Sequence, residues 1–156
     1  MTAIPKFGVG ASALRKEDKR LIQGLGSYTA DKNAEGQLYG YVVRSPYASA
    51  TFTFEDLDAA REAEGVVAIL TAEDVADLGP VTVISGVKQP DGSKPKLRPA
   101  PVLCDGDVKY VGDAVAYVVA ETLAQAQDAA ELIMIDWEEK DANTVTAKAL
   151  RRGRFG

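Results

Sequence analysis

The sequence contains no histidine and a single cysteine, Cys104, and both scarcities restrict its chemistry. One cysteine cannot form an internal disulfide or supply the ligands of a zinc or iron–sulfur site. Without histidine, the commonest general base and metal ligand is missing. The lack of histidine excludes a histidine-centred triad, and the single cysteine excludes a paired-cysteine site. The motifs of a nucleophile elbow and of a P-loop are also absent. We expect Cys104 to be a buried small hydrophobic residue.

Positive charge and long hydrophobic runs are also scarce. The chain has 18 lysines and arginines against 23 acids, a net charge of −5, which argues against sequence-independent binding to nucleic acid. No apolar run approaches the length that spans a bilayer, and the first residues lack a secretory pattern. We therefore expect a cytoplasmic protein with no membrane partner. With 156 residues, 46% of them hydrophobic, it is long enough for one domain with a real core.

Acidic pairs and closely spaced glycines are present but do not indicate a site. The pairs lie at expected helix starts or in exposed polar runs, where capping explains them: Asp56/Asp58, Glu73/Asp74 and Glu138/Glu139. Gly24 and Gly26 lack the preceding strand and the third glycine of a phosphate-binding loop. From its residues alone, the chain has no active site of its own.

Residues 114–120 are the segment around which we expect the fold to be organised. The segment is apolar on both alternating faces, with Val115, Tyr117 and Val119 on one of them. A half-exposed strand would alternate apolar with polar residues. The pattern therefore predicts a strand that is central in its sheet and covered on both sides.

A helix over 122–131 is predicted to follow that strand. Thr122 can cap it, with Gln125 three residues later completing a capping box. Its apolar stripe consists mostly of alanine, and small side chains let a helix lie close to a sheet. Residues 132–137 then predict another strand.

The remaining segments predict an α+β fold with a mixed sheet and a few short helices. Further strands are expected at 38–44, 50–55 and 66–70, short helices at 14–22, 56–63 and from Thr71 to about residue 79, and a hairpin turn at Asp105–Gly106. Phe52 and Phe54 should share the buried face of their strand.

Composition divides the chain into a flexible arm at 1–13, a domain at 14–138 and a polar extension at 139–156 with a basic end. Within the domain, residues 88–98 form a basic loop containing Lys94 and Lys96. A loop of this length is either solvated or held by a partner, and the sequence leaves both alternatives open.

Four separated segments carry a resemblance to a known family. They are LIQGLGSYTAD (21–31), RSPYA (44–48), GVVAILTAED (65–74) and VKYVGDAVA (108–116). In this order and spacing they resemble the N-terminal α/β-hammerhead domain of the large, molybdenum-binding subunit of the molybdenum hydroxylases. That family includes xanthine dehydrogenases, aldehyde oxidases and aerobic carbon monoxide dehydrogenases. The resemblance covers about residues 12–150.

The resemblance implies an oxidoreductase built from several polypeptides. The family oxidises carbonyl compounds, N-heterocycles or carbon monoxide with a molybdenum–pterin cofactor, iron–sulfur clusters and usually FAD. Its pterin-contacting segments and glutamate base lie in domains that follow this one, so no catalytic, cofactor-binding or metal-binding residue is carried over. We expect a structural, non-catalytic domain whose partners are the rest of the large subunit and the iron–sulfur and FAD subunits.

The resemblance and the basic loop together point to an interface. The residues expected there are Arg44, Ser45, Pro46, Tyr47, Gly112 and Asp113, with Lys94 and Lys96 from the loop.

Five residues depart from the family pattern, at three places in the chain. Tyr47 and Ser49 stand where histidines are frequent, Asp113 stands in place of glutamate, and Lys140-Asp141 in place of a Leu-Pro pair. The last departure and the basic end suggest a truncated or naturally short version, whose exposed apolar surface would make it self-associate. The competing hypothesis is a stand-alone module that binds an acidic ligand or protein through the 88–98 loop or the 44–46 turn.

Overall fold

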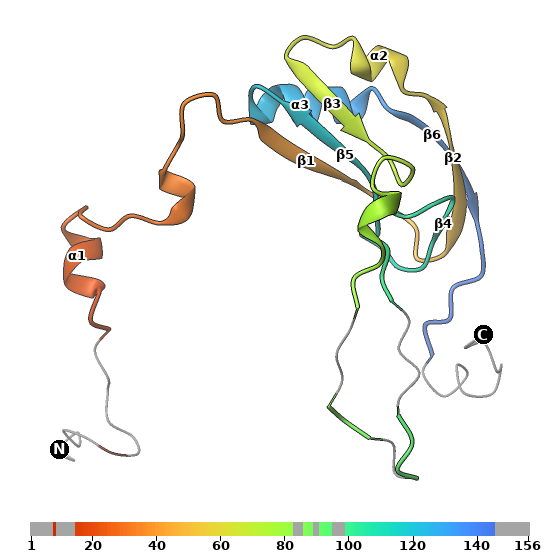
Figure 1. Cartoon of the computed structure of the whole chain (residues 1–156), viewed down its shortest axis with the longest axis horizontal. Helices are drawn as coiled ribbons and strands as arrows, with labels where there is room; N and C mark the ends of the chain where they lie inside the picture. The colour runs from red at the N-terminus through yellow and green to blue at the C-terminus, as the bar shows by residue number, and fades with distance from the viewer. Residues whose placement is uncertain (1–7, 9–14, 83–85, 89–90, 95–98, 146–156) are drawn as a thin grey trace. The chain divides into compact units, whose positions relative to one another are not determined.

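The computed structural model describes residues 8, 15–82, 86–88, 91–94 and 99–145, which form two compact units, 1–37 and 38–156 (Figure 1). The described part of the first unit contains the short helix α1 (Asp18–Ile22) and one 3-10 turn, η1 (Thr29–Asp31). The helix expected at 14–22 is therefore shorter than predicted. The arm at 1–13 lies almost wholly outside the described residues. The boundaries 14–138 and 139–156 stay predictions.

The second unit is built on two three-stranded sheets in which every strand pair is antiparallel. One sheet has the order β1 (Tyr39–Arg44), β5 (Ala114–Ala120), β3 (Val66–Leu70). The other has the order β4 (Asp107–Val108), β2 (Ala50–Asp56), β6 (Met134–Glu139). With their short helices, these sheets confirm the α+β fold class.

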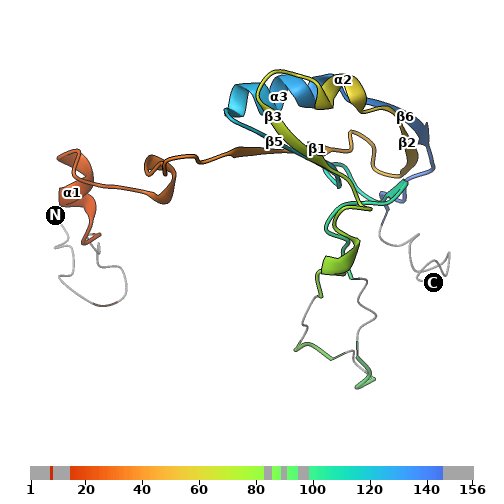
Figure 2. The same cartoon turned by 45° about the horizontal axis from the view of Figure 1, so that its top comes forward.

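Strand β5 lies at the centre of its sheet, as predicted, with β1 and β3 on its two edges. One of its faces is fully buried through Ala116, Val118 and Ala120. Helices α2 (Asp58–Arg61) and α3 (Leu123–Glu131) cover that face (Figure 2). On the opposite face Val115 is fully buried, whereas Tyr117 and Val119 are half-buried. Coverage on that side is therefore incomplete within this chain.

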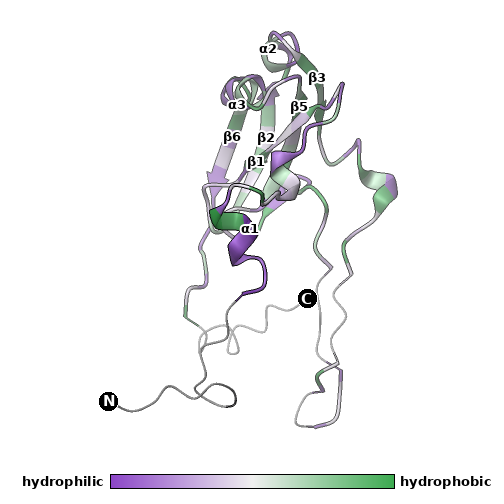
Figure 3. Cartoon of the chain, turned by 90° about the vertical axis from the view of Figure 1, so that its left-hand side faces the viewer, coloured by the Kyte–Doolittle hydropathy of each residue, from purple (hydrophilic) through white to green (hydrophobic). Residues whose placement is uncertain are grey.

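Helix α3 begins at the predicted cap, Thr122, but the predicted capping box with Gln125 does not form. The Thr122 hydroxyl oxygen accepts the backbone N–H of Gln125 at 3.2 Å, and the hydroxyl donates to the Gln125 side-chain oxygen at 2.8 Å. Ala126 and Ala129 are fully buried against β5. The strand after the helix, β6, pairs with β2 in the other sheet. Along β6 the hydropathy changes from hydrophobic at its start to hydrophilic at its end (Figure 3).

A second core joins the two sheets. It contains Phe52 from β2, Val108 from β4 and Val115 from β5, with the buried Cys104 beside them, as expected for that residue. The Phe52 ring packs on Trp137 of β6 at a centroid distance of 5.2 Å. Phe52 and Phe54 share the inner face of β2, as predicted.

The helix predicted from Thr71 is wrong. Only one 3-10 turn, η2 (Ala76–Leu78), forms there. The Asp74 carboxylate accepts the backbone N–H of Thr71 at 2.7 Å and its hydroxyl at 3.1 Å, a contact typical of a helix start, but the residues that follow form only turns. Gly79, with φ +66°, then ends the segment after too few residues for a stable helix.

The hairpin predicted at Asp105–Gly106 is also wrong. The strand after it, β4, pairs with β2, and the Phe52 N–H donates to the Gly106 carbonyl at 3.0 Å. The segment before it turns the other way, because the Cys104 N–H donates to the Ala114 carbonyl at 2.7 Å. Long-range partners therefore override a strong local turn signal.

Candidate functional site

The predicted interface residues come together where two turns are bonded side by side. We call residues 44–47 and 109–113 the paired turns. The Ser45 N–H donates to the Asp113 carbonyl and the Gly112 N–H donates to the Ser45 carbonyl, both at 2.8 Å. These bonds follow a β-bulge at Val43/Arg44 in the pairing of β1 with β5. The two turns are therefore fixed to each other through the backbone.

The second of the paired turns is a four-residue turn from Tyr110 to Asp113. The Asp113 N–H donates to the Tyr110 carbonyl at 3.2 Å. Gly112, at the third position, has φ +94°, a conformation that residues with a Cβ rarely adopt. Glycine at this position therefore shapes the turn.

Two buried polar side chains hold the paired turns from within. Ser45 is 2% exposed, and its hydroxyl oxygen accepts the Tyr47 N–H and donates to the Tyr47 carbonyl, each at 3.0 Å. Asp113 is 6% exposed, and its carboxylate accepts the Lys109 N–H at 2.7 Å. Hydrogen bonding to the nearby Asp113 carboxylate, and then the charge of that carboxylate, raise the pKa of the Tyr110 hydroxyl above its ordinary 10.0.

The outer surface of the paired turns carries apolar side chains and two cations, Arg44 and Lys109, of which Lys109 forms an ion pair with Asp107. Tyr110 is 57% and Val111 64% exposed, and Pro46 is also exposed. The Arg44 guanidinium donates through Nη1 to the Gly112 carbonyl at 2.8 Å, and it forms no ion pair with any described residue. The sequence-based set missed Tyr110 and Val111, although both lie in the VKYVGDAVA segment. Their apolar character there is typical of a buried strand.

The two lysines expected at the interface are not joined to the paired turns in the described structure. Lys94 is exposed and forms none of the bonds described above. Lys96 lies outside the described residues. The role of the 88–98 loop stays a prediction.

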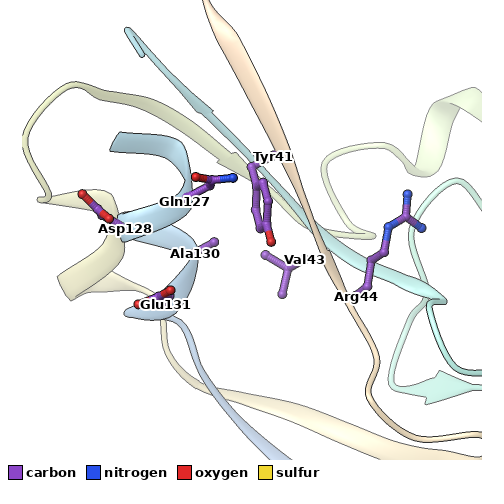
Figure 4. A pocket seen from close by; sticks show the side chains of 7 residues that line it. All are labelled: Tyr41, Val43, Arg44, Gln127, Asp128, Ala130 and Glu131. Carbon is purple, nitrogen blue, oxygen red and sulfur yellow. The ribbon is translucent and has the colours of Figure 1, made fainter. Parts of the chain in front are cut away.

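A shallow hollow of about 470 Å³ lies between edge strand β1 and helix α3 (Figure 4). Tyr41 and Val43 form one wall and Ala130 lies in the other, with Gln127 pointing toward the Tyr41 ring. The charged residues of its lining are Arg44, Asp128 and Glu131, and Arg44 projects away from the helix. Two carboxylates against one cation do not suit an acidic ligand.

Within the described ranges, no three histidine, cysteine or carboxylate side chains are grouped so that they could hold a metal ion. No helix in the described part of the chain is long and apolar enough to cross a membrane.

Comparison with known proteins identifies the fold. Residues 23–141 match the family model described as aldehyde oxidase and xanthine dehydrogenase, a/b hammerhead domain. The chain is 34% identical over 146 residues to the nicotine 6-hydroxylase large subunit of Paenarthrobacter nicotinovorans, covering 93% of this chain and 17% of that protein. It is 36% identical over 129 residues to the xanthine dehydrogenase molybdenum-binding subunit of Escherichia coli O157:H7, which covers 83% of this chain and 17% of that protein.

Solved structures agree with these sequence matches. Quinoline 2-oxidoreductase from Pseudomonas putida 86 superimposes with a TM-score of 0.74 at 36% identity, covering 95% of this chain and 18% of that one. Carbon monoxide dehydrogenase from Oligotropha carboxidovorans superimposes with a TM-score of 0.74 at 33% identity, covering 91% of this chain and 16% of that one. The chain thus spans about a sixth of the length of these relatives, which are large subunits of molybdenum hydroxylases. The resemblance predicted from the four segments is confirmed: the chain belongs to the aldehyde oxidase and xanthine dehydrogenase a/b hammerhead domain family.

Proposed function

We propose that this chain is a structural and interface domain of a molybdenum hydroxylase, an oxidoreductase, and that it has no catalytic activity by itself. Its partners are the other domains of the large subunit and the iron–sulfur and FAD subunits. The molybdenum–pterin cofactor, the iron–sulfur clusters and FAD are held by those other polypeptides. The proposed location is the cytoplasm, which cell fractionation would test.

The observation that carries this proposal is the distribution of large apolar side chains. The largest fully buried side chains are three valines, Val108, Val115 and Val118. Larger or equal apolar residues stand at the surface of the second unit, among them Val67, Tyr110, Val111, Leu132 and Met134. Contiguous exposed apolar surface often marks a site where another protein binds. A domain filled mainly by alanine and valine is therefore suited to be packed against other protein.

The chemistry of the described residues supports the non-catalytic part of the proposal. The buried polar side chains, Ser45 and Asp113, both form hydrogen bonds with backbone groups of the paired turns. Two of the acidic pairs bind backbone N–H groups, since Asp56 and Asp74 accept those of Asp58 and Thr71, and in the third pair Glu138 accepts the Thr51 hydroxyl. Neither group is positioned to move a proton of a substrate.

A domain exchange tests the proposal. The region of quinoline 2-oxidoreductase that matches this chain would be replaced by the whole chain, and assembly of the large subunit with its partner subunits would be followed by size-exclusion chromatography. We expect the chimera to assemble, because the two folds superimpose closely. The matched control is the same enzyme without the region, which should not assemble. A chimera that assembles no better than this control would contradict the proposal, as would dye-linked oxidation of a family substrate by the isolated chain.

A further inference from the structure

We infer that the surface formed by Arg44, Pro46, Tyr110 and Val111, here called the paired-turn surface, anchors this domain to its partner polypeptide. The partner offers an apolar pocket bordered by a carboxylate. The inference rests on the proposed function and specifies which part of the domain makes the decisive contact.

The paired-turn surface is rigid before any partner binds. Two backbone bonds of 2.8 Å fix Ser45 to Gly112 and Asp113. The Asp113 carboxylate accepts the Lys109 N–H at 2.7 Å, which closes the second turn from within. Side chains that are already ordered lose little conformational entropy on association. Exposed apolar residues on such a base are therefore better suited to docking than those at a mobile loop tip.

The Tyr110 side chain can be buried by a partner without leaving a polar group unpaired. A tyrosine at an interface normally needs a new acceptor for its hydroxyl, because an unpaired buried donor is costly. Here the Asp113 carboxylate of the same turn lies close enough to raise the pKa of the hydroxyl, so it is the acceptor at hand when the ring is covered. The ring of Tyr110 and the side chain of Val111 are 57% and 64% exposed, and both are available to an apolar pocket.

Arg44 specifies the charge of the partner. Its guanidinium is held over the turn by the 2.8 Å bond to the Gly112 carbonyl, and no carboxylate among the described residues neutralises it. Covering this cation with a neutral surface would leave a desolvated charge, whereas a carboxylate forms a paired hydrogen bond with a guanidinium. Arginine and tyrosine are also the residue types that most often dominate binding energy at interfaces.

The test uses the quinoline 2-oxidoreductase chimera with matched single substitutions. Val111→Ser and Arg44→Gln each alter the paired-turn surface. Val67→Ser alters a comparably exposed valine on β3, and Arg61→Gln alters an exposed arginine on α2. We expect the first pair to lower the yield of assembled enzyme at least about tenfold relative to the second pair, as for residues that dominate an interface. Thermal unfolding of each isolated chain checks that the variants fold.

A second measurement avoids substitutions altogether. Hydroxyl-radical footprinting of the unaltered chain, read by mass spectrometry, compares the isolated chain with the assembled chimera. Oxidation of Tyr110 and Val111 should fall at least about tenfold on assembly, because a hot spot is fully desolvated. Footprinting decides the matter if a paired-turn variant fails to fold.

The outcomes separate the inference from the proposed function. Equal yields for all four variants, or unchanged footprints at the paired turns in an assembled chimera, overturn the inference and leave the proposed function standing. A chimera that does not assemble overturns both. If Val111→Ser abolishes self-association of the isolated chain in sedimentation but leaves chimera yield unchanged, the occupant is a second copy of this chain and the inference is wrong.

Discussion

At the scale of single residues, Asp113 has the widest influence on the candidate site. Its carboxylate is almost fully buried, yet it is stabilised by the Lys109 N–H and the Tyr110 hydroxyl, so its charge is not isolated. The residue therefore helps to hold the turn in shape.

The raised pKa of Tyr110 gives a pH-dependent prediction. The hydroxyl donates to Asp113 only while it is protonated, so this contribution to stability is fully present below the ordinary pKa of tyrosine and is lost as the pH rises through the raised pKa. Asp113→Asn removes the negative charge and should return the pKa of Tyr110 toward 10.0. Ultraviolet titration of the phenolate measures this pKa, with Tyr110→Phe identifying the signal. An unchanged titration in Asp113→Asn would contradict the bond.

Gly112 provides a second prediction at this scale. Alanine at φ +94° is strained although no atom lies within 4 Å of the added Cβ, so Gly112→Ala should lower the free energy of unfolding by about 1 kcal/mol. Gly86→Ala is the control, since Gly86 also has open space around it but no positive φ. Denaturant unfolding of both variants makes the comparison. Equal effects would show that the turn does not require glycine.

At the scale of elements, β5 and α3 are the parts that local sequence describes best. The central position of β5 and the Thr122 cap both follow from residues that are neighbours in sequence, and both are confirmed. The Thr71 helix and the Asp105–Gly106 hairpin are wrong for different reasons. Gly79 ends the first segment after too few residues for a stable helix, and β2 offers β4 a partner far away in sequence.

The cap of α3 can be tested directly. Thr122→Ala removes the acceptor of the Gln125 N–H and should lower the free energy of unfolding by about 1 kcal/mol. Thr122→Ser keeps the hydroxyl and should restore most of that stability. Chemical denaturation compares the three chains. If serine and alanine behaved alike, the hydroxyl would not be the capping group.

The alanine face of α3 gives another prediction for an element. Ala126 is fully buried between the helix and β5, so Ala126→Leu should push the helix away from the sheet and cost about 1–3 kcal/mol of stability. Gln127→Leu, one residue further along the helix and lining the hollow, is the control and should cost less. Thermal unfolding measures both. A well-tolerated leucine at position 126 would mean that the close approach of α3 to the sheet is not required.

At the scale of the whole molecule, the exposed apolar surface indicates more about function than the hollow between β1 and α3 does. The fold class, the central strand and the family follow from sequence pattern, and so does the cluster of Arg44, Ser45 and Asp113. The exposure of Tyr110 and Val111 cannot be predicted from the sequence, because a Tyr-Val pair beside an apolar run has the same local pattern whether it is buried or exposed. Their exposed fractions become clear only once the two turns are bonded side by side in the fold.

The exposed apolar side chains lead to a prediction for the isolated chain. It should self-associate as its concentration rises, since Tyr110, Val111 and Met134 remain in contact with water. Sedimentation velocity over a range of concentrations measures this, and Val111→Ser with Met134→Ser should weaken it. A monomer at every concentration would show that this apolar surface is tolerated without a partner.

The most direct test of the central claim is the activity of the domain exchange. Quinoline oxidation is measured for quinoline 2-oxidoreductase carrying this chain in place of its own matching region, for the enzyme without that region, and for the isolated chain. We expect activity only in the quinoline 2-oxidoreductase that carries this chain, because we propose that the chain supplies the docking domain and the remaining polypeptides supply the chemistry. Activity in the isolated chain, or none in an exchange whose parts are each folded, would contradict it.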